Sequence, residues 1–421
     1  MIIHSASQVI TCAGGPQRGS ATGELGLIEN GAVVIQNERI LDTGPTPEML
    51  QAYPHDERIS AEDRVVMPGL VDPHTHVLWA GDRAGEFEMR IQGRSYQEIM
   101  DAGGGIVSTV RDTRGASVEE LKEETRHRLR RMFAHGTTTL EGKTGYGLEL
   151  QAELRSLQAY LELDAEVPQD LAATFLGAHA VPPEYKGDTS AYTTLVCDEM
   201  LPGVADWWTN HTQAALPFVD VFCEQGAFSL AQSRRILERA RALGFPVKIH
   251  ADEFENLGGA SLAAELDAAS ADHLVVTSDE DIKALARSDT VAVSLPCTPF
   301  GLAEGGYTPA GKILSAGGLL AIATDLNPGT AWCESMQFAM ALACRYLGLT
   351  PAQAIVASTI NAAAAIHRDH EVGSLETGKK ADMLILDSSD YRHLGYRFGT
   401  NLVRTVIKDG SVYRKEELLW E

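Results

Sequence analysis

Two histidines lie one residue apart in the stretch VDPHTH, residues 71–76, directly after an apolar run. In an extended chain, side chains at positions i and i+2 point to the same side, so His74 and His76 can direct two imidazoles at one point. Imidazole nitrogen is a common ligand of zinc and of other transition-metal ions. The spacing therefore predicts half of a metal site, and the remaining ligands must come from elsewhere in the chain.

The central part of the sequence predicts the elements that could supply those ligands. Between about residues 67 and 371, short apolar runs alternate with amphipathic stretches, a pattern typical of parallel βα units. One helix is clearly delimited, because Ser117 and Glu120 form a capping box and Gly136 ends it. Eight apolar runs are candidate strands: 66–72, 137–142, 173–178, 219–224, 246–251, 271–276, 291–296 and 320–325. This pattern predicts a (β/α)8 TIM-like barrel, with a doubly wound open sheet as the alternative.

Both ends of the chain predict β-structure. The segment GAVVIQNERILDTG predicts a hairpin that turns at Asn37 and Glu38, and RTVIKDGSVYR predicts one that turns at Asp409 and Gly410. ADMLILD, residues 381–387, predicts an apolar strand close to the C-terminus. Residues 1–66 and 372–421 are therefore expected to form one composite β-sandwich domain, beside a barrel domain at 67–371.

Polar residues follow most of the expected strands, at the end where a barrel of this kind carries its catalytic groups. They are His74, His76, His179, Glu224, His250, Glu253, His273 and Asp325. A catalytic metal needs three or four nitrogen or oxygen ligands and one position left for water. A single histidine after a strand is more often hydrogen-bonded in place, and an aspartate before Asn-Pro-Gly more often forms a turn. Gathered on one barrel face, however, His74, His76, His250 and Asp325 favour a metal site.

Composition restricts the partners and the compartment. The formal net charge of -23 disfavours nucleic acid and anionic membrane surfaces, since both attract basic proteins. No run approaches the roughly 20 apolar residues of a membrane span, and the N-terminus lacks a signal-peptide pattern, so we expect a cytoplasmic protein. The 6 cysteines lie far apart without a CxxC pair, which predicts reduced thiols with no catalytic role.

Several segments resemble a known family. MPGLVDPHTH, KIHADE, ADH, ATDLNPG and GSLETGKKADMLILD resemble the amidohydrolase superfamily, over nearly the whole chain. Longer strings are similar to its imidazolonepropionase family: THVLWAGDRAGEFEMRIQGRSYQEI, GGGIVSTVRDTR, EGKTGYGLEL and TFLGAHAVPPEY. The resemblance implies a homodimeric hydrolase of histidine degradation. It would open the cyclic amide C–N bond of 4-imidazolone-5-propanoate and give N-formimino-L-glutamate.

The resemblance also implies one divalent metal ion, zinc or iron, on the four ligands that the spacing already indicates. Two-metal relatives in the superfamily use a carbamylated lysine at the end of strand four, where this chain has Cys223 and Glu224. A site for a single metal ion is therefore expected. Lys143, at the end of the second expected strand, is expected to make a structural ion pair.

The expected chemistry is attack by a metal-activated water on the ring carbonyl, because a bound divalent ion lowers the pKa of its water towards about 7. Glu253 is placed to take or relay a proton, and His273 to hold the attacked oxygen or the water. Asp325 could pass a proton to the leaving ring nitrogen. Without the resemblance, an exposed loop carboxylate at Glu253 and a buried structural histidine at His273 would be the preferred interpretations.

The substrate is expected to be a small molecule with a carboxylate arm, which Arg83 could bind bidentately. The alternative for Arg83 is a salt bridge with one of its acidic neighbours, Asp82, Glu86 or Glu88. Tyr96 could add a hydroxyl donor or simply begin a helix. By resemblance, the further substrate-binding residues are Tyr146, His179, Asn327, Gly329 and Thr330.

Two rival functions stay open. A deaminase acting on a formimino or ring amidine substrate would use the same metal core, but it would release ammonia and would not need Arg83 for a carboxylate. A non-enzymatic metal-binding scaffold is the second rival. Glu253 and His273 argue against it, because a scaffold needs no proton-transfer groups.

Overall fold

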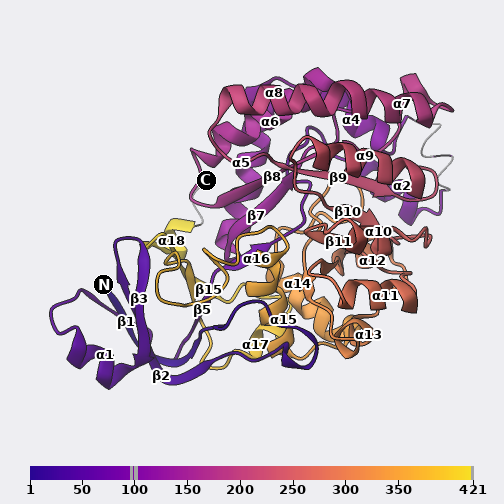
Figure 1. Ribbon diagram of the computed structural model, residues 1–421. Helices are drawn as coiled ribbons and strands as arrows, with labels where there is room; N and C mark the ends of the chain where they lie inside the picture. The colour runs from indigo at the N-terminus through magenta and orange to yellow at the C-terminus, as the bar shows by residue number, and fades with distance from the viewer. Residues whose placement is uncertain (95–97, 99–102, 419–421) are drawn as a thin grey trace.

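The computed structural model describes residues 1–94, 98 and 103–418 and is built around a parallel barrel (Figure 1). Eight strands follow one another around it in sequence order, each parallel to the next. They are β6 (Leu70–Asp72), β7 (Thr137–Lys143), β8 (Asp170–Ala178), β9 (Phe218–Cys223), β10 (Ile249–Ala251), β11 (Ser270–His273), β12 (Val291–Ser294) and β13 (Leu320–Ile322). A parallel bridge between Thr75 and Leu326 joins the segments that follow β6 and β13, so the barrel is nearly closed. The predicted barrel is confirmed and the open-sheet alternative is wrong.

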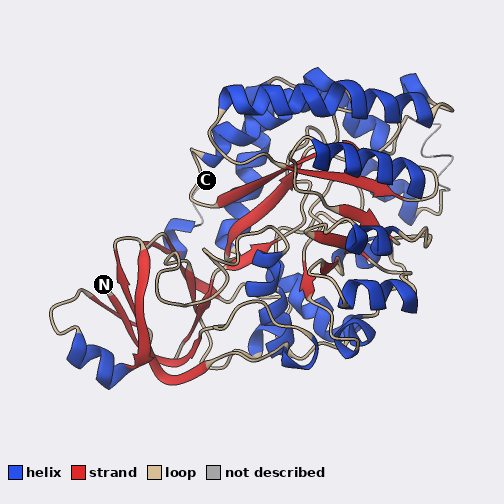
Figure 2. Ribbon diagram, in the orientation of Figure 1, coloured by secondary structure: helices blue, strands red, loops and turns tan. Residues whose placement is uncertain are grey.

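Helices cover the outside of the barrel (Figure 2). The longer ones are α4 (Ile106–Gly115), α5 (Val118–Ala134), α6 (Leu150–Asp164), α8 (Leu201–His211) and α9 (Leu230–Ala242). Shorter ones are α2 (Ala84–Ile91), α7 (Thr189–Leu195), α10 (Gly259–Glu265), α11 (Asp279–Ala286), α12 (Cys297–Leu302), α13 (Ala310–Ser315), α14 (Met336–Leu342), α15 (Pro351–Ala357) and α16 (Ile360–Ala364). The predicted helix is α5, which has the full capping box of Ser117 and Glu120 and is followed by Gly136 at φ +98°.

The two chain ends form a second, mixed sheet, where indigo and yellow segments lie side by side in Figure 1. Its strands are β1 (Ile2–Ile10), β2 (Leu27–Gln36), β3 (Arg39–Pro45), β4 (Arg58–Ser60), β5 (Val65–Pro68), β14 (Met383–Leu386), β15 (Val403–Lys408) and β16 (Ser411–Arg414). The short helices α1 (Thr46–Ala52), α17 (His393–Tyr396) and α18 (Lys415–Leu418) belong to the same terminal segments. Both predicted hairpins are present, and all four turn residues have positive φ. The expected β-structure from both chain ends is thus confirmed.

The first predicted strand, 66–72, is wrong as a single strand. Val65–Pro68 pairs with β1 and β14 of the terminal sheet, whereas Leu70–Asp72 pairs with β7 of the barrel. Gly69 lies at the change of sheet, and a Cβ there would lie 2.2 Å from Thr138 Oγ1. The apolar run is continuous because both sheets bury it, so hydrophobicity alone does not show where the chain changes partners.

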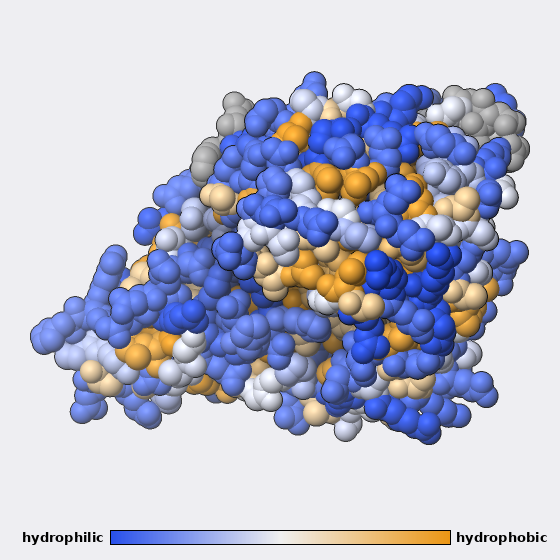
Figure 3. Space-filling view, turned by 45° about the horizontal axis from the view of Figure 1, so that its top comes forward, coloured by the Kyte–Doolittle hydropathy of each residue, from blue (hydrophilic) through white to orange (hydrophobic). Residues whose placement is uncertain are grey.

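The surface of the face seen in Figure 3 is mostly hydrophilic, with apolar groups gathered towards its middle. Within the described residues, no helix combines the length and the apolar character that a bilayer span requires. All six cysteines lie in the described part of the chain and are free, as predicted.

The interior of the barrel is unusually polar. Residues two apart in an extended chain face the same side, and such pairs here are polar: Glu141 and Lys143 on β7, and Lys248, just before β10, with His250 on it. These four side chains are at most 3% exposed. Apolar packing between strands and helices outside the barrel therefore supplies the hydrophobic stabilisation, while the inside is available for charged and ligating groups.

Gly69→Ala is expected to destabilise the protein by about 1–3 kcal/mol, because the added methyl group overpacks against Thr138. Denaturant or thermal unfolding would measure the loss. Gly311→Ala is the matched control, since Gly311 lies in α13 with open space around its Cβ position, and alanine there is expected to stabilise by up to about 1 kcal/mol. Equal effects of the two changes would contradict the packing argument.

Candidate metal centre

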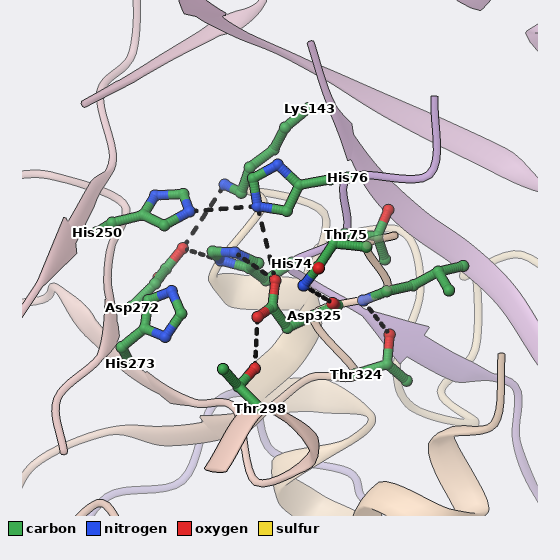
Figure 4. Close-up of polar contacts among 12 residues, drawn as sticks. His74, Thr75, His76, Lys143, His250, Asp272, His273, Thr298, Thr324 and Asp325 are labelled. Atoms are coloured by element: carbon green, nitrogen blue, oxygen red, sulfur yellow. Dashed lines mark hydrogen bonds and ion pairs between the residues drawn. The ribbon is translucent and has the colours of Figure 1, made fainter. Parts of the chain in front are cut away.

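The four predicted metal ligands meet at the carboxyl ends of the barrel strands (Figure 4). His74 and His76 follow β6, His250 lies within β10, and Asp325 follows β13. The Nε2 atoms of His76 and His250 are 3.3 Å apart, and Asp325 Oδ1 lies 3.5 Å from His74 Nε2 and 3.6 Å from His76 Nε2. The three histidines alone offer ligand atoms that all lie within 4.8 Å of one another. The structure brings the whole predicted set together.

These atoms fit a divalent cation. His74 Nε2 and Asp325 Oδ1 are buried, and neither has a hydrogen-bond partner among the described residues. Leaving such groups unpaired costs free energy, and lone pairs that face one another repel. A divalent ion bound between three imidazole nitrogens and one carboxylate oxygen removes both costs, and this donor set suits zinc and iron.

A carboxylate lies against the Nδ1 atom of two of the ligand histidines, His74 and His250. His74 Nδ1 lies 2.6 Å from Asp272 Oδ2, and His250 Nδ1 lies 2.9 Å from Asp220 Oδ2. Because an ionised carboxylate only accepts hydrogen bonds, the contact with Asp272 places the ring proton of His74 on Nδ1 and leaves its Nε2 with a lone pair. The contact of His250 with Asp220 is an ion-pair distance without hydrogen-bond geometry. Burial lowers the pKa of His74 well below its usual range, which keeps the ring neutral and able to bind a metal.

Asp325 is held on its other oxygen, because Thr298 Oγ1 donates to Asp325 Oδ2 at 2.5 Å. Asp325 and His273 both have positive φ, +53° and +79°, in a region that side chains other than glycine rarely adopt. Such residues cost about 1–3 kcal/mol each and cluster at functional sites. Here the strained positions are a predicted ligand and a predicted catalytic residue.

Lys143 forms the expected ion pairs inside the barrel. Its Nζ lies 2.9 Å from Glu141 Oε1 and 2.7 Å from Asp220 Oδ2, and none of the three side chains is exposed. Burial works against its charge, but the neighbouring carboxylates, first Asp220 and then Glu141, raise the pKa of Lys143 above its usual range. Lys248 contacts the same cluster, 3.0 Å from Glu141 Oε2, and donates to the carbonyl of Pro73.

Glu253 and His273 face each other beside the ligands, with Glu253 Oε2 3.7 Å from His273 Nε2. The Glu253 side chain is 10% exposed, so the alternative of an exposed loop carboxylate is wrong. Burial, followed by the charge of Asp325, raises the pKa of Glu253 well above its usual range. Burial also lowers the pKa of His273 well below its usual range. The site therefore places a carboxyl group that binds its proton more tightly than usual beside an imidazole that binds its second proton more weakly than usual.

A cavity of about 700 Å³ opens above the ligands, within the usual size range of small-molecule sites. Every predicted site residue lines it except His74, which lies fully buried beneath. The lining residues from the prediction are His76, Arg83, Tyr146, His179, His250, Glu253, His273, Asp325, Asn327, Gly329 and Thr330. His179 stacks on His76 with ring centroids 4.7 Å apart. Tyr96 lies outside the described residues.

Arg83 makes one of the salt bridges that the sequence left as an alternative, and it also faces the cavity. It lines the cavity, and its Nε donates to Glu86 Oε2 at 2.8 Å. The other oxygen of Glu86 accepts from Gly105 N and Ser108 Oγ, so Glu86 ties the arginine to the start of α4. A Cβ on Gly329 would lie 2.2 Å from Arg83 Nη1, which shows that the arginine passes directly over this glycine.

Asn327 lines the cavity, but its amide is used within its own loop. Its Nδ2 donates to the carbonyl of Asp325, and its Oδ1 accepts the N–H groups of Gly329 and Thr330. Its contribution is therefore to shape the loop after β13.

Several residues near the site escaped the sequence analysis. Glu224 was noted only as polar, yet it is buried and accepts the backbone N–H groups of Phe254 and Glu255, which fixes the loop that carries Glu253. Lys186 adds an exposed cation at the cavity.

Among the residues that support the ligands, Asp220 and Asp272 could have been suspected from the sequence, because charged residues inside an apolar strand need a buried partner. Thr298 carries no such signal in the sequence.

The chain matches known families over most of its length. The amidohydrolase family matches residues 65–413, and the imidazolonepropionase-like composite domain of bacteria matches residues 31–55. An imidazolonepropionase of Herpetosiphon aurantiacus is 51% identical over 99% of this chain and 98% of its own. One of Chloroflexus aggregans is 50% identical over 98% of each chain.

Solved structures share the fold at much lower identity. An adenosine deaminase from Xanthomonas campestris with bound zinc has a TM-score of 0.72 and 19% identity, covering 100% of this chain and 94% of its own. The guanine deaminase of E. coli has a TM-score of 0.74 and 14% identity, covering 98% of each chain. At this identity the likeness shows the architecture only.

Glu253→Gln is expected to make the metal-free protein more stable at neutral and alkaline pH. The folded protein raises the pKa of Glu253, so this group favours folding below its unfolded pKa of about 4.3 and loses that contribution as pH rises through the folded value. Glutamine has no such cost, so the difference from the parent should grow from acidic to alkaline pH.

Thermal unfolding of metal-free protein across this pH range measures the effect. Glu255→Gln is the control, because Glu255 is exposed on the same loop and its change should leave the pH dependence of the parent intact. A constant offset between Glu253→Gln and the parent at every pH would refute the buried-acid interpretation.

Proposed function

The chain belongs to the amidohydrolase family and, within it, to the imidazolonepropionases, and from this membership we propose how its residues perform the reaction. It hydrolyses the cyclic amide C–N bond of 4-imidazolone-5-propanoate to give N-formimino-L-glutamate in histidine degradation. The structural observation that supports this function is the joint presence, in one cavity, of a His/Asp ligand cluster and Arg83.

We infer that the site holds one divalent ion, zinc or iron, on His74, His76, His250 and Asp325. When bound, such an ion acts as a Lewis acid and lowers the pKa of a water towards about 7, which makes a nucleophile available at neutral pH. The two Nδ1–carboxylate contacts keep His74 and His250 oriented for this purpose.

Proton transfer falls to the residues around the ring carbonyl. The water oxygen adds to that carbon, and Glu253 takes or relays the proton that the water loses. His273 is neutral and can donate its N–H to the carbonyl oxygen as negative charge develops there. As the C–N bond breaks, Asp325 takes the remaining proton of the added hydroxyl group and passes it to the leaving nitrogen, which leaves the new carboxyl group ionised. The new carboxylate and the formimino nitrogen remain in one product molecule, so no ammonia is released.

Arg83 is proposed to bind the propionate carboxylate. Glu86 occupies its Nε, which leaves the two terminal nitrogens for a bidentate contact. Tyr146, His179 and Thr330 line the cavity between the arginine and the ligand cluster and are proposed to contact the ring and its arm. The same resemblance supports a cytoplasmic homodimer, which sedimentation of the purified protein would test for subunit number.

The deciding experiment follows the ultraviolet absorbance of the imidazolone ring on addition of protein, with and without prior chelation, while ammonia is assayed in parallel. We expect loss of the chromophore that depends on the metal, without ammonia. Ammonia release would instead assign the chain to the deaminases, and no turnover with full metal occupancy would favour the scaffold.

Arg83→Met is expected to raise KM by about 10- to 100-fold with a smaller effect on kcat, because a hydrogen-bonded charge contact contributes about 1.5–3 kcal/mol. Steady-state kinetics would measure both constants. Arg94→Met is the matched control, since Arg94 is exposed, does not line the cavity and forms an ion pair with Glu98, four residues along the chain. If Arg83→Met left KM unchanged, the carboxylate would have to be bound elsewhere in the cavity.

A further inference from the structure

Five ionisable side chains lie beneath the metal centre and have no part in the proposed proton transfers. They are two lysines and three carboxylates, all at 0% side-chain exposure: Lys143, Lys248, Glu141, Asp220 and Asp272. None of them is among the residues that line the cavity. Four of them come from β7, β9 and β11, and Lys248 directly precedes β10, so they connect neighbouring strands through the interior of the barrel.

Two carboxylates of this network, Asp220 and Asp272, contact metal ligands, and both also lie next to Lys143. Asp220 contacts His250 Nδ1 at 2.9 Å and Lys143 Nζ at 2.7 Å through the same oxygen, Oδ2. Asp272 Oδ2 contacts His74 Nδ1 at 2.6 Å and lies 3.7 Å from Lys143 Nζ. Each carboxylate that contacts a ligand histidine therefore also lies next to Lys143. Figure 4 shows the contact between Lys143 and Asp272.

A gain in stability is a weak explanation for this arrangement. Removing charges from water costs several kcal/mol per ion, and apolar residues of similar volume often stabilise a core as well or better. An orienting role accounts for the contacts more directly. Without the Lys143 ammonium group, Asp220 would lose a direct ion pair at 2.7 Å, and Asp272 would keep Lys248 Nζ at 3.8 Å but lose Lys143 at 3.7 Å. Both carboxylates could then turn away from the imidazoles.

The same ammonium groups account for a second cluster of possible ligands. His74, Glu141 and Asp272 offer three donor atoms within 4.8 Å of one another, as a metal site would. However, Lys143 and Lys248 lie 2.9 Å and 3.0 Å from the two oxygens of Glu141. The positive charge at this place comes from the protein, so the cluster supports the neighbouring ligands and is not a second metal site.

We propose that Lys143 is a positioning residue of the metal centre. It holds Asp220 and Asp272 against the Nδ1 atoms of His250 and His74, so that both Nε2 lone pairs point to the ion. The residue touches neither substrate nor metal, and it sets metal affinity through the carboxylates. This inference rests on the metal site of the proposed function, but not on the substrate.

The test is a double-mutant cycle of Lys143→Met and Asp220→Asn, with Co²⁺ binding measured in the absence of substrate. Competition with a chromophoric chelator gives the affinity, and the visible absorption of bound Co²⁺ reports ligand geometry. Each single variant is expected to bind Co²⁺ about 10- to 100-fold more weakly, the usual effect of losing such an outer contact. The double variant should lose less than the product of the two effects, because both act through His250.

Lys408→Met is the matched control for a general effect of removing a buried lysine. Lys408 in the terminal sheet is 2% exposed and pairs with Asp170, Asp382 and Asp409, far along the chain from any ligand. Its loss should reduce thermal stability without changing Co²⁺ affinity or the visible spectrum. An equal fall in affinity for Lys408→Met and Lys143→Met would overturn the proposal, since the effect would then be global.

Two further outcomes would also overturn it. Lys143→Met could bind Co²⁺ at the His/Asp site as tightly as the parent does, whether or not a second Co²⁺ binds at the Glu141 cluster. The lysine would then have no role in positioning the ligands. If that variant fails to fold, Asp220→Asn, which keeps the side-chain shape, decides alone, and parental affinity in it would refute the inference. A parent that binds Co²⁺ but does not hydrolyse the substrate would refute the proposed function and leave this inference standing.

Discussion

The structure depends on holding four metal-ligand atoms close together in an almost fully buried place at the base of the cavity. Three imidazole nitrogens and a carboxylate oxygen converge at the mouth of the barrel. They repel one another unless a cation lies between them, so other residues must hold the ligand side chains in position. Asp272, Asp220 and Thr298 do this by occupying the far side of three of the four ligands. The position of each of these supports is in turn fixed by a barrel strand or by the helix that follows one.

This requirement explains why the two faces of the barrel strands carry different kinds of residue. Outward-facing residues pack against helices and provide apolar burial, while inward-facing residues carry charge. A parallel barrel suits such a site because all the strands end on the same side, so residues far apart in sequence are brought to one face. The terminal sheet joins the barrel through β5 and Gly69, a few residues before the ligand pair.

The sequence predicted those parts of the site that depend on local spacing. His74 and His76 follow from the period of an extended chain, and the barrel follows from eight apolar runs. The sequence did not reveal the change of sheet at Gly69, because both sheets bury the same run of residues. It could not assign Asp220 or Asp272 to histidines, because these contacts join strands whose registers only the folded barrel defines. Asn327 was expected to meet substrate, but its amide hydrogen bonds lie within its own turn.

The antiparallel pairing of β5 with β14 has a consequence for synthesis of the chain. Val65–Pro68 emerges from the ribosome early, whereas its neighbour Met383–Leu386 is among the last segments to be made. Until then one edge of β5 is open, and exposed strand edges invite pairing with other chains. Completion of this sheet is also a long-range closure, of the kind that slows folding. Nascent chains that stall before residue 383 should therefore be the aggregation-prone species, although every metal ligand has already been translated.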